Sequence, residues 1–278
     1  MKVGVVGLGT MGAGIAQVCV EAGFETVGRE VSAELGEKAR GRIDHFLTRK
    51  VEKGQLPEGE KDAAIRRLSL TTELDDLAGC DIVIEAAFED LDVKQELFRE
   101  LSRFDGILAT NTSALSVTEV ASAADRPERV VGMHFFNPAP LMKLVEIVRA
   151  ERTSDEVFER AYAFAQELGK EPIRCNDTPG FAVNRILIPL LNDCIRVLDE
   201  AGITPEDLDT AMRHGAGWPM GPCTLVDLVG IDIHVHASEA LHDKLREPRM
   251  APPARLVRMA NAGKLGRKSG EGFYRYDD

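Results

Sequence analysis

Cations are in short supply in this sequence, and the shortage argues against one class of partner. Its 278 residues include 34 Lys and Arg against 46 Asp and Glu, for a formal net charge of −12. Because a nucleic-acid-binding protein usually presents a basic face, we expect no nucleic-acid partner. The acidic total does not exclude small anionic ligands, which local charges and backbone N–H groups can hold.

Long apolar runs and closely spaced cysteines are also missing. No run approaches the roughly 18 apolar residues of a transmembrane helix, and the glycine-broken start at residues 1–7 does not resemble a signal peptide. The five cysteines are widely spaced without a CxxC pattern, and the histidines form no HExxH pattern. We therefore expect reduced thiols, no metal site, no membrane segment and a cytoplasmic location.

Hydrophobic periodicity divides the chain into an alternating α/β part and a purely helical part. In the first part, short apolar strands alternate with amphipathic helices, and Thr153 with Glu156 predicts a capping box before the last helix. Strands are predicted at 2–6, 24–28, 81–86, 107–109, 130–134, 144–148 and 172–175, and helices at 11–22, 33–53, 58–68, 93–104, 118–124 and 155–168. Helices alone are predicted beyond that, at 181–202, 205–214, 224–229, 233–245 and 254–262.

This order of elements predicts the fold class and the domain organisation. Alternating strands and helices favour a parallel sheet covered by helices, and the strand signals stop near residue 180. We expect an α/β Rossmann-type parallel-sheet domain over residues 1–180, followed by a smaller all-α domain over residues 181–278.

A glycine-rich loop joins the first predicted strand to the first predicted helix. Its sequence, Gly7-Leu8-Gly9-Thr10-Met11-Gly12, matches GxGxxG in the context that dinucleotide binding requires. The first glycine permits the tight turn, the second lets a pyrophosphate approach, and the third allows close packing of helix on strand. The alternative is that these are ordinary turn glycines.

Glu30 lies at the end of the second predicted strand, 18 residues beyond the last glycine of the loop. A carboxylate there can accept hydrogen bonds from the ribose hydroxyls of NAD and would repel the 2′-phosphate of NADP. Arg29 beside it keeps NADP open as an alternative. A solvated surface charge is the simplest other interpretation of Glu30.

His134 ends a predicted strand, at the edge of an open α/β sheet where ligands bind. A histidine in that place can act as a general base near neutral pH. By position and chemistry alone, a structural histidine remains an alternative.

The sequence as a whole resembles the short-chain L-3-hydroxyacyl-CoA dehydrogenases, especially the bacterial 3-hydroxybutyryl-CoA dehydrogenases. Several long and distinctive motifs carry the resemblance over essentially the whole chain. They are GLGTMGAGIAQ at 7–17, IEAAFEDLDVKQELF at 84–98, ATNTSAL at 109–115, GMHFFNPAPLMKLVE at 132–146, DTPGFAVNR at 177–185, GAGWPMGP at 215–222 and LGRKSGEGFY at 265–274.

The resemblance implies NAD-dependent, reversible oxidation of an L-3-hydroxyacyl-CoA, such as 3-hydroxybutyryl-CoA, to the 3-oxoacyl-CoA. It implies His134 as the base, oriented by Glu146, with Ser113 and Asn184 bonding the substrate. A helix cap for Ser113 and an interface amide for Asn184 are the structural alternatives. The implied contacts of NAD are Gly7, Gly9, Thr10, Met11, Gly12, Glu30, Glu89, Lys94 and Asn111. Solvated charges are the simplest other interpretation of Glu89 and Lys94.

The phosphates of an acyl-CoA need cations, and residues 38–53 carry a local excess of them. Arg49 and Lys53 are four residues apart and share a helix face where the family places its CoA-contacting basic residues. A solvated helix face is the alternative. The family, together with the broad apolar stripe of residues 181–198, also implies a homodimer formed through the helical domain.

Two other functions stay open at this point. A related dehydrogenase could act on a free hydroxy acid or sugar acid, in which case the basic helix would have no role. The protein could also be a non-catalytic NAD-binding relative. Such a protein would not need the four catalytic candidates, which are His134, Glu146, Ser113 and Asn184, so their joint presence argues against it. The reaction that the resemblance implies is a step of butyrate-type metabolism, of fatty-acid β-oxidation and of aromatic-acid degradation.

Overall fold

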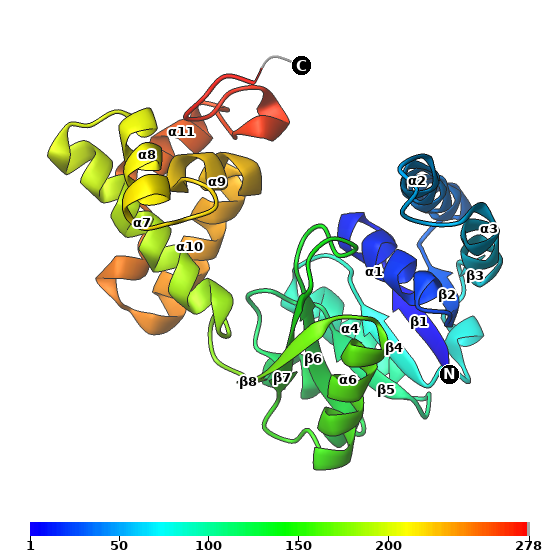
Figure 1. The fold of residues 1–278 in the computed structure, drawn as a ribbon. Coiled ribbons are helices and arrows are strands. Elements are labelled where there is room, and N and C mark those ends of the chain that lie inside the picture. The colour runs from blue at the N-terminus through cyan, green and yellow to red at the C-terminus, as the bar shows by residue number, and fades with distance from the viewer. Residues whose placement is uncertain (277–278) are drawn as a thin grey trace. The chain divides into compact units, whose positions relative to one another are not determined.

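The computed structural model describes residues 1–276, which fall into two compact units with the division between Phe181 and Ala182 (Figure 1). The first unit contains every strand of the large sheet, and the second is helical. No helix in the described part of the chain is both long and apolar enough to cross a membrane.

The first unit is built on an eight-stranded sheet with the strand order β3-β2-β1-β4-β5-β6-β7-β8. The order reverses beside β1, so that β1 and β4 are neighbours, as in a doubly wound dinucleotide-binding fold. The predicted Rossmann-type fold is thereby confirmed. The strands are β1 Lys2–Val6, β2 Glu25–Arg29, β3 Leu68–Thr71, β4 Ile82–Glu85, β5 Ile107–Thr110, β6 Val130–Phe135, β7 Leu144–Arg149 and β8 Glu171–Asn176.

Helices cover both faces of this sheet, and each face has its own apolar core (Figure 1). Ile15, Ile43 and Phe158 belong to one core, and Phe98 and Val120 belong to the other. One face is covered by α1 Thr10–Glu21, α2 Ala33–Glu52, α3 Glu58–Arg66 and α6 Asp155–Glu167, and the other by α4 Leu91–Leu101, α5 Val117–Ala121 and the 3₁₀ turn η1 Leu74–Leu77. A second 3₁₀ turn, η2 Pro127–Arg129, precedes β6.

Three details of the sequence prediction are wrong. The strand β3 was not predicted, because it is a four-residue edge strand with one buried side chain. The sheet is not entirely parallel, since β6 and β7 pair in opposite directions. The cap of α6 is Ser154, whose hydroxyl accepts from the Val157 N–H; the Thr153 hydroxyl donates to the Val130 carbonyl oxygen instead.

In its described residues, the second unit packs five helices around a main apolar core and a smaller apolar cluster of Ile188, Leu241 and Met250. The carboxylate of Asp227, on α9, is buried and accepts hydrogen bonds from the N–H groups of Phe273 and Tyr274 and from the Tyr276 hydroxyl. This carboxylate therefore anchors the GEGFY segment. The elements are α7 Val183–Ala201, α8 Pro205–Gly215, α9 Pro222–Val229, α10 Ile231–Leu245, α11 Ala254–Asn261, and the 3₁₀ turns η3 Pro248–Met250 and η4 Arg267–Ser269.

His234 is a buried titratable group of the second unit. Its Nε2–H donates to the Oδ1 atom of Asn192 over 2.9 Å, and the Asn192 amide in turn donates to the carbonyl oxygens of Arg249 and Met250. Burial lowers the pKa of His234 from 6.5 to about 4. The network therefore joins α7, α10 and η3 through a neutral imidazole.

We expect this histidine to make the second unit sensitive to acid. The imidazole of His234 takes up a proton near pH 6.5 in the unfolded chain but only near pH 4 in the folded protein. Its contribution to folding stability is therefore fully present above pH 6.5 and is lost as the pH drops toward 4. A pKa shift of this size corresponds to about 3 kcal/mol of folding free energy. The difference in thermal midpoint between wild type and His234→Gln should change across this pH range. Replacing the exposed His45 with Gln should leave the pH dependence of the midpoint as in the wild type. An equal pH dependence in wild type and His234→Gln would contradict the assignment.

Candidate active site

His134 and Glu146 face each other across the antiparallel pair of strands β6 and β7. The register places the two residues directly opposite, and the His134 Nδ1 atom lies 2.7 Å from the Glu146 Oε2 atom. Both side chains are buried, Glu146 completely. A carboxylate at Nδ1 favours the tautomer with the proton on that nitrogen, which leaves Nε2 as a proton acceptor. The pair therefore has the geometry of an oriented general base.

Two phenylalanine rings flank the His134 imidazole. The ring centroids of Phe136 and Phe181 lie 4.5 and 5.7 Å from the centroid of the imidazole. Phe181 holds a backbone φ of +46°, in a region that side chains other than glycine rarely adopt. Packing that fixes this conformation keeps the buried ring against the histidine. The sequence prediction missed both rings, because neither contact follows from local spacing.

The glycine loop has the geometry that a dinucleotide phosphate requires. Gly7 has a φ of +83°, and a Cβ atom on Gly12 would lie 1.7 Å from the Gly7 carbonyl oxygen. A Cβ on Gly9 would meet no atom within 4 Å, so that side of the loop is open. Gly9 also caps α1 without a side-chain hydrogen bond, and no acidic residue lies in the first turn. The first N–H groups of α1, where Thr10 and Met11 lie, are thus suited to a pyrophosphate.

Glu30 is tied to the same loop. Its carboxylate accepts from the N–H of Leu8 over 2.8 Å and from the N–H of Val31 over 2.7 Å. Arg29, the residue that kept NADP open as an alternative cofactor, donates its Nε–H to the carbonyl oxygen of Thr72. The acidic group therefore lies beside the glycine loop, as ribose recognition requires.

Glu89 organises the loop that carries Ser113. One carboxylate oxygen of Glu89 accepts from the Thr112 hydroxyl, the N–H groups of Ser113 and Ala114, and the Ser113 hydroxyl, the last over 3.3 Å. Burial alone would raise the pKa of Glu89, but the ammonium group of Lys94 and these hydrogen bonds hold the pKa below its usual value. Ser113 is not the cap of the next helix, because Ser116 fills that position.

Lys94 is enclosed rather than exposed to a ligand, with 1% of its surface accessible. Its Nζ lies 2.7 Å from Glu85 Oε1 and 3.3 Å from Glu89 Oε2. Glu85 is completely buried and also accepts from the Thr110 hydroxyl and the Ala87 N–H. Lys94 therefore links the buried carboxylate of Glu85 to Glu89 and holds Glu89 in place. The sequence prediction missed Glu85, since a carboxylate at the end of an apolar strand resembles an ordinary boundary residue.

The two asparagines of the predicted site lie in different units. The Asn111 side-chain oxygen accepts from the N–H of Phe135, so Asn111 joins the end of β5 to the end of β6 beside His134. Asn184 is partly buried in the first turn of α7, in the helical unit. His134, Glu146, Ser113 and Asn111 thus belong to the first unit, and Asn184 belongs to the second.

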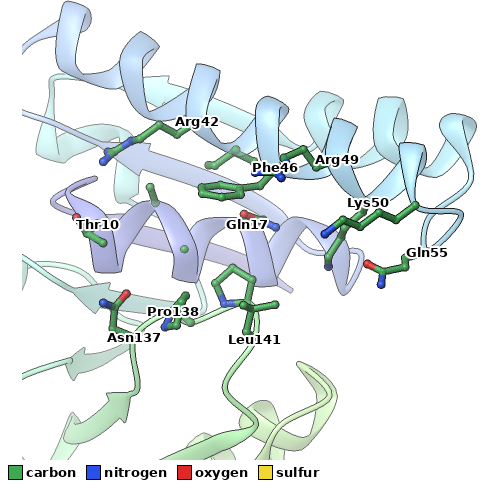
Figure 2. Close-up of a pocket in the computed structure, with 16 residues that line it drawn as sticks. Thr10, Gln17, Arg42, Phe46, Arg49, Lys50, Gln55, Asn137, Pro138 and Leu141 are labelled. Atoms are coloured by element: carbon green, nitrogen blue, oxygen red, sulfur yellow. The ribbon is translucent and has the colours of Figure 1, made fainter. Parts of the chain in front are cut away.

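A pocket of about 480 Å³ lies between α1, α2 and the loop 137–141 that follows β6 (Figure 2). Phe46 and Leu141 are among its apolar walls, while Arg49 and Lys53 add positive charge. Lys50 also lines it but is paired with Glu21 over 2.6 Å. Arg49 and Lys53 have no ion-pair partner in the described part of the chain. Arg42, which also lines the pocket, likewise has no ion pair among the described residues, so the predicted basic helix leaves three cations for an anionic ligand.

Comparisons with known proteins find relatives that match nearly the whole chain. Residues 2–178 match the NAD-binding domain of 3-hydroxyacyl-CoA dehydrogenase, and residues 180–276 match its C-terminal domain. The 3-hydroxybutyryl-CoA dehydrogenase of Mycobacterium tuberculosis is 44% identical over 99% of this chain and 98% of its own length. The corresponding enzyme of Clostridioides difficile is 39% identical, with both chains covered completely.

A solved structure of a related enzyme has the same fold. The crystal structure of (S)-3-hydroxybutyryl-CoA dehydrogenase from Ralstonia eutropha is similar with a TM-score of 0.96 at 40% identity, covering 100% of this chain and 99% of that one. The chain therefore belongs to the 3-hydroxyacyl-CoA dehydrogenase family, and its first unit is the NAD-binding domain of that family.

Proposed function

We propose that the protein catalyses the reversible, NAD-dependent oxidation of an L-3-hydroxyacyl-CoA of short chain length, such as 3-hydroxybutyryl-CoA, to the 3-oxoacyl-CoA. The buried His134–Glu146 pair carries this proposal, because it provides an oriented base in the domain that also holds the open glycine loop. The similarity to dehydrogenases named for 3-hydroxybutyryl-CoA supports the same substrate class.

In the proposed reaction, His134 Nε2 takes the proton of the substrate's 3-hydroxyl group. The bond between C3 and its hydrogen breaks with both electrons, and NAD supplies the acceptor for that hydride. Glu146 stabilises the resulting imidazolium over the 2.7 Å hydrogen bond and keeps the ring in place. In the reverse direction, the imidazolium returns its proton to the 3-oxo oxygen as the hydride arrives.

Ser113 and Asn184 are proposed to bind the substrate's oxygen atoms. The Ser113 hydroxyl now points to Glu89 over a long 3.3 Å contact, which a substrate oxygen can replace at low cost. The proposed contacts of NAD are the glycine loop, including Thr10 and Met11, together with Glu30, Glu89 and Asn111, while Lys94 acts through Glu89. The fit rests on the open side of Gly9 and the uncapped start of α1.

The CoA part of the substrate is proposed to bind the pocket beside α2. Removing one charge, as in Arg49→Met or Lys53→Met, should raise the KM for acetoacetyl-CoA about 10-fold, because one charge-assisted hydrogen bond contributes about 1.4 kcal/mol. The kcat and the KM for NADH should stay unchanged. Lys38→Met, on the same helix but outside the pocket, is the control. If acetoacetyl-pantetheine, which lacks the nucleotide phosphates, is affected equally, the assignment is wrong.

The helical unit is proposed to form a homodimer, and the protein is proposed to be cytoplasmic. Several large apolar side chains of this unit are exposed, and burying them against a second copy would stabilise a dimer. They are Ile186, Val197, Leu228, Val229 and Ile233.

For a 30.4 kDa chain, light scattering at micromolar concentration should give a mass of twice that value. Ile186→Arg, at a side chain 67% exposed in the single chain, should shift the mass toward that of one chain. A wild-type mass of a single chain would contradict the dimer.

A direct experiment tests the proposed reaction. NADH oxidation should be followed with 3-oxoacyl-CoA substrates from four carbons upward, with NADPH in parallel. We expect turnover of acetoacetyl-CoA with NADH and much weaker turnover with NADPH. No turnover of any member of the series would support a non-catalytic NAD-binding relative instead.

A further inference from the structure

Arg42 reaches from α2 to the glycine loop, which it contacts from the pocket side. Its Nη2 donates to the Leu8 carbonyl oxygen over 2.6 Å and lies 3.4 Å from the Gly9 carbonyl oxygen. Both acceptors belong to the loop whose geometry suits a dinucleotide phosphate. The position of this loop therefore depends on a side chain of another helix.

Leu8 is held from two sides. Its N–H donates to Glu30 and its carbonyl oxygen accepts from Arg42. Glu30 is the residue proposed to bind the cofactor ribose, so the ribose acceptor and the arginine fix the same backbone segment. A change in the position of Arg42 would therefore alter a contact that helps to fix Leu8 in the proposed NAD site.

Arg42 also lines the pocket proposed for CoA. Figure 2 shows it at the end of the pocket where Thr10 lies, with Arg49 and Lys50 toward the other end. A guanidinium group has five N–H donors, and the loop carbonyls use those of Nη2. The Nε–H is enclosed by protein atoms and has no hydrogen-bond partner in the part of the chain that the structure describes. The two donors of Nη1 are therefore the ones that suit an anion in the pocket.

We propose that Arg42 is a positioning residue that couples the two ligand sites, and this inference rests on the proposed function of the pocket. A CoA phosphate near Arg42 would hold the guanidinium against the loop, and a loop ordered by the dinucleotide would hold Arg42 in place for the phosphate. The cost of ordering Arg42 is then met by the first ligand, so the second ligand binds more tightly. By thermodynamic linkage the effect is equal in both directions.

The test measures the Kd of NADH by fluorescence titration, with and without saturating free CoA, which allows no turnover. We expect CoA to tighten NADH binding about 5-fold or more in the wild type, the lower range of measured couplings. In Arg42→Met the ratio of the two Kd values should fall to about 1. Arg49→Met is the matched control: it should weaken CoA itself but preserve the ratio once CoA is saturating.

Other outcomes separate this inference from the proposed function. If CoA binds but the wild-type ratio is 1, or if Arg42→Met keeps the wild-type ratio, the coupling role is wrong and the pocket assignment stands. If the wild type does not bind CoA by calorimetry, the pocket assignment fails as well. Should Arg42→Met not fold, Arg42→Lys replaces it, because one ammonium group cannot span the loop carbonyls and an anion; its ratio should also be near 1.

Discussion

Replacing His134 with alanine should lower kcat by on the order of 10³-fold, since a positioned general acid–base contributes about 10² to 10⁴ to the rate. The loss should appear in both directions of the reaction, because the same nitrogen takes and returns the proton. The Kd of NADH should change little, as the proposed NAD contacts lie on the glycine loop and near Glu89. Steady-state kinetics with acetoacetyl-CoA and a separate NADH titration measure the two quantities.

Glu146→Gln is the companion variant. A glutamine keeps a hydrogen-bonding group at the same place, but its amide can donate to Nδ1 and so favour the wrong tautomer. We expect a loss in kcat of at least about 10²-fold, the lower end of what a positioned general base contributes, again without a change in NADH affinity. A His134→Ala enzyme with near wild-type kcat would show that another group takes the proton.

Replacing Lys94 with methionine should cost about 3–5 kcal/mol of stability, because it leaves the buried carboxylate of Glu85 without its counter-charge. Glu85 is fully buried and its Oε1 lies 2.7 Å from the Lys94 ammonium. For a domain of this size, the thermal midpoint should fall by roughly 10 °C. The variant should also lose activity, because Glu89 and the Ser113 loop lose the charge that holds them.

Two further variants separate this effect from a general loss of charge. Lys143→Met removes an exposed lysine 3.8 Å from Glu171 and should change stability by less than about 0.5 kcal/mol. Adding Glu85→Gln to Lys94→Met removes both buried charges, and should recover part of the lost midpoint. If the double variant is less stable than Lys94→Met alone, the buried charge is not the cause.

Much of the fold follows from local patterns. Apolar periodicity predicted seven of the eight strands, and GxGxxG between β1 and α1 identified the dinucleotide loop. The missed strand β3 lies at the sheet edge, where Leu68 is the one buried side chain and the apolar alternation is too short to predict a strand. Thr153 and Ser154 both have capping side chains, and only the contact of Thr153 with Val130, 23 residues away, decides between them.

The site was less predictable because its contacts cross between strands. The twelve-residue spacing of His134 and Glu146 becomes a cross-strand pair only because β6 and β7 run in opposite directions, which periodicity does not reveal. The enclosure of Lys94 by Glu85 and Glu89 depends on β4 and α4 meeting in three dimensions. Arg42 lies in the basic segment 38–53, yet its Nη2 donates to the Leu8 carbonyl oxygen of the glycine loop, which local spacing does not reveal.

The most direct test of the central claim compares kcat/KM for acetoacetyl-CoA and for free acetoacetate, with NADH as the reductant. Two phosphate contacts of about 1.4 kcal/mol each, from Arg49 and Lys53, predict a preference of at least about 100-fold for the CoA substrate. Equal values for the two substrates would contradict the account, because the pocket beside α2 would then contribute nothing and the protein would be a dehydrogenase of free hydroxy acids.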